Sequence, residues 1–197
     1  MKTLIVAAIR CSLMFTAVAV FALAHPVKAN LITNGGFETG DFTGWTVFEI
    51  GTPFTAVVGG AVGGISPHSG AFQAASDSSG VFLTQSVTTT PGASYIVDFW
   101  LAAAAENGAI SSSVLWAGSV IFGQAFFSSS GYTEHTFTLT APSATTELQF
   151  FSSSLAGFFL LDDVSVNSAG VPDAGSTLPL LSFALLGVAV LRRKLRC

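Results

Sequence analysis

The sequence predicts an all-β protein whose central domain is an antiparallel β-sandwich of the jelly-roll type. Short apolar and β-branched runs recur between Asn30 and Gly170, and clusters of Gly, Pro, Ser and Asn separate them. No long stretch in this region keeps a helical period. Many short strands with regular turn signals between them are typical of sandwiches and jelly rolls.

Ten segments of the central region carry the strand pattern. In chain order they are residues 45–50, 54–58, 72–75, 81–87, 95–103, 112–116, 120–122, 133–139, 147–152 and 158–166. Because side chains alternate between the two faces of a strand, residues 95–101 should bury one set of side chains, which consists of Tyr95, Val97, Phe99 and Leu101.

The same rule applied to the last segment gives a less ordinary result. Leu160, Asp162, Val164 and Val166 should share one face, with Asp163 on the other. Asp162 would then lie among apolar neighbours. A buried carboxylate needs a partner, so we expect a metal ion or a hydrogen-bond donor beside it.

Charge is divided sharply along the chain. All seven Lys and Arg residues lie near the two ends, and none occurs from residue 29 to residue 191. Residues 30–170 contain ten Asp or Glu side chains. Such a surface repels phosphate, which excludes nucleic acid and anionic lipid as partners. Both cysteines, Cys11 and Cys197, fall in the terminal segments, so the central domain contains no disulfide.

The N-terminal segment, residues 1–29, has the pattern of a secretory signal peptide. Lys2 and Arg10 precede an apolar core, and small residues surround the expected cleavage point after Ala29. The alternative is an uncleaved anchor, but the apolar run is shorter than the roughly 20 residues that span a bilayer. We therefore expect a mature chain that begins at Asn30, with the sandwich domain at residues 30–168.

The C-terminal segment, residues 171–197, has three parts. A short motif at 171–177 precedes an apolar stretch at 178–191, predicted to be a transmembrane helix, and a basic tail at 192–197. The motif residues are Val171, Pro172, Asp173, Gly175, Ser176 and Thr177. A permanent membrane anchor would use the same apolar stretch and basic flank but would leave the motif unexplained. The basic end argues against a GPI signal, whose tail normally ends apolar.

This tail resembles the tripartite sorting signal of PEP-CTERM proteins, in the variant that begins Val-Pro-Asp. Ala174 stands where that variant more often has Gly or Ser. The resemblance implies export by the secretion machinery, transient anchoring in the inner membrane and processing by an exosortase. It further implies delivery to the surface or extracellular matrix of a Gram-negative-type bacterium.

The central domain is similar to galactose-binding-like jelly rolls, including carbohydrate-binding modules. The similarity rests on the opening 30–40 with Gly44 and Trp45, on segments 83–87 and 91–95, and on the closing run 161–166. It implies a structural calcium ion at Glu38 and Asp162, with Asp163 a less favoured ligand. Calcium prefers six to eight oxygen ligands, which carboxylates and backbone carbonyls supply. Alternatively, these carboxylates accept backbone N–H bonds.

Sugar binding requires an aromatic platform beside polar groups. Trp100 with Asp98, or Trp116 near Glu106 and Asn107, are the candidates for extracellular polysaccharide, although both tryptophans can instead be packed. Catalysis has little support, because the domain has two histidines, no cysteine and no Gly-x-Ser-x-Gly motif. The sequence thus predicts an exported, non-catalytic structural or adhesive protein, with a carbohydrate-binding module as the alternative.

Overall fold

A computed structural model describes residues 29–51, 54–77, 79–105, 110–126, 128–154 and 156–170 of the chain. The predicted signal peptide at 1–29 lies outside these residues except for Ala29, and so do the sorting motif, the apolar stretch and the basic tail at 171–197. Within the described part of the chain, no helix is long and apolar enough to span a membrane.

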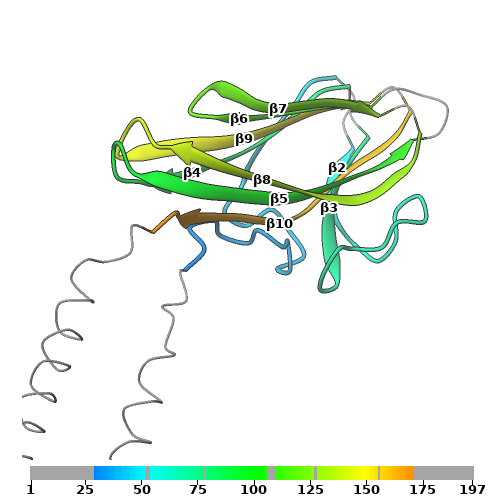
Figure 1. Cartoon of the computed structure of the whole chain (residues 1–197). Coiled ribbons are helices and arrows are strands. Elements are labelled where there is room, and N and C mark those ends of the chain that lie inside the picture. Colours follow the sequence, from blue (N-terminus) through cyan, green and yellow to red (C-terminus); the bar gives the residue numbers. More distant parts are fainter. Residues whose placement is uncertain are drawn as a thin grey trace, which may run out of the picture.

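Two antiparallel five-stranded sheets lie face to face, which confirms the predicted fold class (Figure 1). Sheet 1 has the strand order β1-β4-β9-β6-β7, and sheet 2 the order β2-β3-β10-β5-β8. The strands are β1 Thr46–Glu49, β2 Thr55–Gly59, β3 Phe72–Ser76, β4 Val81–Thr88, β5 Ser94–Ala105, β6 Ile110–Trp116, β7 Ser119–Phe126, β8 Ser130–Thr140, β9 Thr145–Ser154 and β10 Gly157–Ser168.

Each predicted segment becomes one strand of the sandwich, and the alternation predicted for β5 is confirmed. Tyr95, Val97, Phe99 and Leu101 are all buried in the space between the sheets. Their neighbours Ile96, Asp98 and Trp100 point to the outer face of sheet 2 and keep some exposure. Among the described residues, the main core cluster runs from Ile32 to Val166, so residues 29–170 contain a core of their own.

The face assignment predicted for β10 is wrong over its first half. Phe159 and Leu161 join Val164 and Val166 in the main core, whereas Leu160 belongs to a second cluster with Ala75 and Ala102. The cause is a β-bulge, because the pairing of β10 with β5 shifts register between Asp162 and Ser165. Asp163 has φ of 48° there. One extra residue in the strand moves the following side chains to the opposite face.

The opening segment holds the bulge in place. Val164 donates its N–H to the carbonyl of Gly35 at 2.9 Å. The two chains approach so closely that a Cβ on Gly35 would lie 2.0 Å from the Val164 carbonyl oxygen. Asn30 joins the first and last parts of the domain, since its amide donates to Val164 and its Oδ1 accepts from Val166. Both described ends therefore emerge side by side (Figure 1).

A loop between β2 and β3, residues 60–71, crosses the outer face of sheet 2, and we call it the strap. Val62 and Ile65 form an isolated β-bridge within it. Both pack against the second cluster, Ala75, Ala102 and Leu160. This cluster lies on the face of sheet 2 that points away from sheet 1. The strap thus covers apolar residues that a two-layer sandwich would otherwise expose.

Candidate functional site

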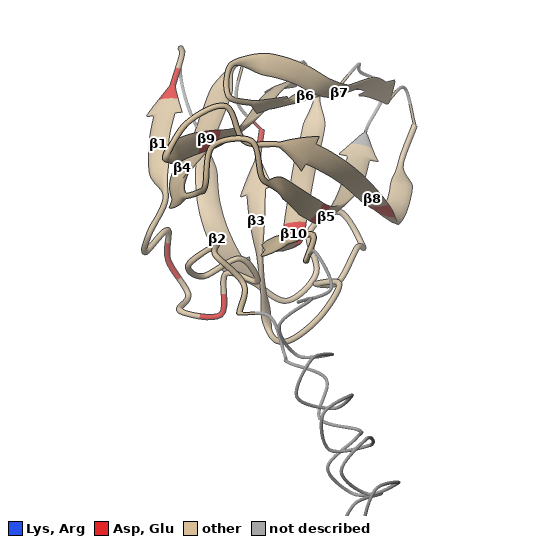
Figure 2. Ribbon diagram, turned by 60° about the vertical axis from the view of Figure 1, so that its left-hand side comes forward, with Lys and Arg blue, Asp and Glu red and all other residues tan. Residues whose placement is uncertain are grey.

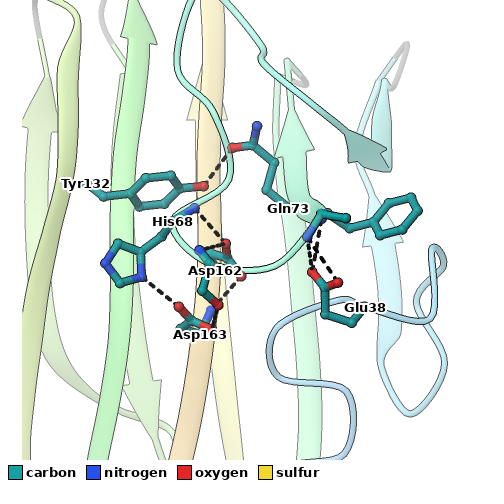
Figure 3. Close-up of polar contacts among 9 residues, drawn as sticks. Glu38, His68, Gln73, Tyr132, Asp162 and Asp163 are labelled. Carbon is teal, nitrogen blue, oxygen red and sulfur yellow. Dashed lines mark hydrogen bonds and ion pairs between the residues drawn. The ribbon is translucent and has the colours of Figure 1, made fainter.

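Asp162 is the centre of a polar cluster between the strap and sheet 2 (Figure 3). Its side chain is fully buried, and the part of the chain that the structure describes carries no Lys or Arg to neutralise it. Oδ2 accepts the backbone N–H groups of His68 at 2.9 Å and Ser69 at 3.3 Å. Oδ1 accepts the N–H of Asp163 at 2.8 Å. Three peptide dipoles therefore take the place of a cation.

Asp163 binds side-chain groups of the strap, whereas Asp162 binds backbone N–H groups of the same loop. Its Oδ2 lies 2.6 Å from Nδ1 of His68, and its Oδ1 accepts the Ser69 hydroxyl at 2.7 Å. Neighbouring side chains of a regular strand face opposite ways. The bulge interrupts this alternation, so Asp163 faces the strap as Asp162 does. Two consecutive carboxylates thus hold two consecutive strap residues.

The His68 ring lies flat on Trp100 of β5. Their ring centroids are 3.6 Å apart at an interplanar angle of 17°, and Tyr132 of β8 meets the same imidazole edge-on at 5.7 Å. The Tyr132 hydroxyl in turn donates to Oε1 of the buried Gln73 at 2.7 Å. Burial raises the pKa of the Tyr132 phenol, and the Asp162 charge raises it further, so the phenol keeps the proton that it donates.

Gln73 and Glu38 tie down the two ends of the strap. The Gln73 amide donates to the carbonyls of Gly60 at 2.7 Å and Ile65 at 3.1 Å. The Glu38 carboxylate, from the opening segment, accepts the N–H groups of Ala71 and Phe72, each at 2.9 Å (Figure 3). Gly70 must lack a side chain here, because a Cβ would lie 2.3 Å from Oε1 of Glu38.

The three predicted calcium ligands gather around Gly36. A Cβ on Gly36 would lie 3.3 Å from Oδ1 of Asp163, 3.9 Å from Oδ1 of Asp162 and 3.8 Å from Cγ of Glu38. Their carboxylates nevertheless point to different strap donors. Among the described residues no group of three or more His, Cys, Asp or Glu side chains is arranged to hold a metal ion. In this arrangement the carboxylates act as acceptors of N–H and O–H groups.

The predicted glycan-binding residues are not presented together. Trp100 and Asp98 share the outer face of sheet 2, but His68 occupies a face of the Trp100 indole and Asp98 accepts the Thr136 hydroxyl. Trp116 is only 4% exposed and donates its indole N–H to the Thr140 carbonyl. Trp116 is therefore a core residue with no ring face open to a sugar, and Trp45 is buried as well.

Neither histidine is arranged as a catalytic base with a serine nucleophile. The Ser69 hydroxyl donates to Asp163 instead of the His68 ring. His135 packs against Phe99 and Phe122, and burial lowers its pKa, partly offset by the charge of Asp98. Both imidazoles thus have structural contacts in the described domain.

A row of phenylalanines on the outer face of sheet 1 was not predicted. Phe48, Phe82 and Phe151 are register partners on β1, β4 and β9, with ring centroids 6.2 and 4.7 Å apart. Phe48 is 62% exposed. Each follows or precedes a core residue in its strand, so alternation places each one outside. Their alignment depends on the pairing register, which sequence alone did not give.

Comparisons with known proteins support both the fold and the tail. Residues 170–195 match the VPDSG-CTERM motif. The fold is similar to the K3 cleaved adhesin domain of Lys-gingipain from Porphyromonas gingivalis, at 16% identity and TM-score 0.56, covering 72% of this chain and 99% of that one. It is also similar to a family 61 carbohydrate-binding module in complex with β-1,4-galactotriose, at 19% identity and TM-score 0.51, covering 71% and 99%.

A third similar structure is the enzymatically active domain of tailspike protein 4 from bacteriophage CBA120, at 15% identity and TM-score 0.53. The match covers 71% of this chain but spans only 21% of the tailspike domain. Among curated proteins, no relative matches the sequence. The chain therefore has a β-sandwich fold like that of carbohydrate-binding modules and carries a PEP-CTERM-like sorting motif at its C-terminus.

Asp162 predicts how the stability of the domain depends on pH. Burial raises the pKa of Asp162 to about 6, and the charge of Asp163 also raises it. Backbone hydrogen bonds from Asp163, Ser69 and His68 lower it and offset part of this rise. The ordinary value is 3.8, so between about pH 4 and pH 6 the folded state holds a proton that the unfolded state has lost. We expect the free energy of unfolding to fall as pH rises through this window.

The matched variant for this measurement is Asp162→Asn. Asn has one oxygen for two acceptor positions, so in either orientation its NH2 group faces a backbone N–H, that of Asp163 or those of His68 and Ser69, and the variant should lower stability by about 1–3 kcal/mol at pH 7. It should also flatten the pH dependence between pH 4 and pH 6, measured by urea unfolding of residues 29–170. An unchanged slope in this variant would show that Asp162 does not cause the pH dependence.

Proposed function

We propose that the protein is an exported, non-catalytic component of the bacterial surface or extracellular matrix, processed at its tail by an exosortase. The observation that carries this proposal is the match of residues 170–195 to a sorting motif immediately after a sandwich domain. The secretion machinery and the inner membrane are the partners that this route requires. The domain has no Lys, Arg or Cys, and its net negative charge repels nucleic acid and anionic lipid, so neutral matrix material is the more suitable contact.

The second candidate function is direct binding of extracellular polysaccharide, and the phenylalanine row favours it. Aromatic rings bind the apolar faces of sugar rings, while nearby polar side chains bond the hydroxyls. Two residues further along the same three strands, the register partners are the polar residues Thr46, Thr84 and Gln149. Since strands lie about 4.8 Å apart, the three phenylalanines extend over roughly 10 Å. This surface replaces Trp100 and Trp116 as the proposed contact.

A structural calcium ion at Glu38 and Asp162, with Asp163 as a less favoured ligand, remains a proposal. Its support is the gathering of these carboxylates around Gly36, and calcium's preference for hard oxygen ligands. The ion would have to replace some of the N–H donors that the carboxylates now bind.

Export and processing are tested by intact-mass spectrometry of the protein purified from the surface of an expressing bacterium that contains an exosortase. We expect a species without residues 1–29 that ends at or before Thr177. The double variant Pro172→Ala, Asp173→Ala should keep its tail, because the motif is altered. Pro142→Ala, an exposed proline in a turn of the domain, is the control and should be processed normally. A mature wild-type species that still carries residues 178–196 would contradict the proposal.

Polysaccharide binding is tested by affinity electrophoresis in gels that contain neutral or anionic polysaccharides. We expect retardation by a neutral polysaccharide and loss of most of it in Phe48→Ala, because this ring is the most exposed of the row. Phe54→Ala removes a ring of similar exposure, 49%, outside the row and should change little. Equal retardation of both variants and the wild type would remove the row as a binding surface.

The calcium proposal predicts a higher melting midpoint in millimolar calcium than in chelator, since a ligand that binds only the folded state stabilises it. Glu38→Gln should abolish this difference. Equal midpoints for the wild-type domain in both buffers would leave the hydrogen bonds from the strap as the whole explanation of these carboxylates.

A further inference from the structure

Both described ends of the chain leave the sandwich beside two of its turns (Figure 1). Backbone bonds join the turn between β4 and β5 to the turn between β8 and β9, from Gly92 to Ala141 at 2.8 Å and from Ala141 to Ala93 at 3.0 Å. Ala169 donates its N–H to Ser94 at 2.8 Å. We call this end of the sandwich the exit end, and it consists of Asn30, residues 89–94, residues 141–144 and residues 168–170.

The exit end carries no charged side chain. The segments that meet there are free of Asp, Glu, Lys and Arg over residues 29–37, 87–97, 135–146 and 164–170. Figure 2 shows the acidic residues of the described domain on its strands and in other loops. Glu147, two residues after the first residue of β9, is the nearest along a strand, and the opposite end carries Glu49 and Asp77. The acidic domain is therefore uncharged at the end where the chain leaves it.

The chain beyond the exit end leads to the apolar stretch of the tail. Seven residues, 171–177, separate Gly170 from the stretch at 178–191. Even fully extended, seven residues reach only about 25 Å. While the tail anchors the protein, the domain is thus held close to the bilayer, and it is held by its exit end. Carboxylates that come within a Debye length of anionic lipid, about 8–10 Å, are repelled by it.

We propose that the exit end is the surface with which the anchored domain faces the membrane, so that its strands stand roughly along the membrane normal. The inference rests on the proposed function, because the tail must first anchor the protein. The ends of the chain also allow the outer face of sheet 2 to lie on the bilayer, but that face carries Asp98 and the exposed Glu134. The exit end brings no carboxylate to the lipid, so an anionic bilayer favours it.

This orientation keeps the phenylalanine row away from the bilayer. Phe82 precedes Thr88, the last residue of β4 at the exit end, by six residues. At about 3.4 Å per residue of an antiparallel strand, the row lies roughly 20 Å from the exit end. The proposed polysaccharide contact therefore stays open while the chain is anchored.

Quenching of a fluorescent probe by nitroxide-labelled lipid headgroups tests the orientation. Full-length protein with Cys11→Ser and Cys197→Ser receives one new cysteine for a thiol-reactive probe, either Ala144→Cys at the exit end or Ser128→Cys in the loop between β7 and β8 at the opposite end. Both positions are exposed. In vesicles of phosphatidylcholine and phosphatidylglycerol, quenching at position 144 should exceed that at position 128 by about twofold or more, because the short tether brings only the exit end to the headgroups.

Added charge tests the cause of the orientation. Thr90→Glu with Ser94→Glu places two carboxylates on the exit end and should lower the quenching at position 144. The loss should occur in vesicles with phosphatidylglycerol, be reversed by salt, and be absent in pure phosphatidylcholine, because it comes from repulsion by anionic lipid. The control is Gln124→Glu with Ser128→Glu, which adds the same charge at exposed positions far from the exit end and should change little. Circular dichroism checks the fold of each variant.

Flotation of the vesicles separates failure of this inference from failure of the proposed function. Protein that floats with the vesicles but shows equal quenching at the two positions, or stronger quenching at position 128, would overturn the orientation and leave anchoring intact. Protein that does not float would contradict the anchoring itself and this inference with it. Equal effects of the two double variants would overturn charge as the cause of the orientation.

Discussion

The domain depends on one constraint, which is that it must satisfy the buried carboxylate of Asp162 without any Lys or Arg. Asp162 shows the solution, because three backbone N–H groups converge on it and two of them belong to the strap. Glu38 is exposed, but its carboxylate also accepts backbone N–H groups, at the other end of the strap. An unpaired buried charge would cost several kcal/mol, so the loop and the carboxylates stabilise each other. The bulge at Asp163 belongs to this arrangement, because it lets both Asp162 and Asp163 face the strap.

This arrangement makes the two outer faces of the sandwich different. The strap covers the outer face of sheet 2, where His68 lies on Trp100 and Val62 and Ile65 cover apolar residues. The outer face of sheet 1 has no comparable cover in the described residues, and its phenylalanines remain partly open. The proposed polysaccharide contact therefore lies on the outer face of sheet 1, whereas Trp100 lies on sheet 2 and Trp116 is buried on the inner side of sheet 1.

The sequence was sufficient for local features and insufficient for features that depend on register. Alternation and turn residues placed all ten strands and the inner face of β5, because both depend on near neighbours in the chain. The bulge was missed, since the left-handed conformation of Asp163 occurs where residues distant in the sequence, the strap and Gly35, bind this part of β10. The row from Phe48 to Phe151 was missed, and the burial of Trp116 was left open, for the same reason, because each depends on which strand lies beside or across from it.

The absence of Lys and Arg from residues 29–191 also determines which proteases can attack the sandwich domain. Trypsin-like enzymes cleave after Lys or Arg, and no such bond exists between Lys28 and Arg192. An exported chain of this composition offers these enzymes no cleavage site even when it is completely unfolded. Its resistance to trypsin-like enzymes follows from its amino-acid sequence and does not depend on the stability of the sandwich.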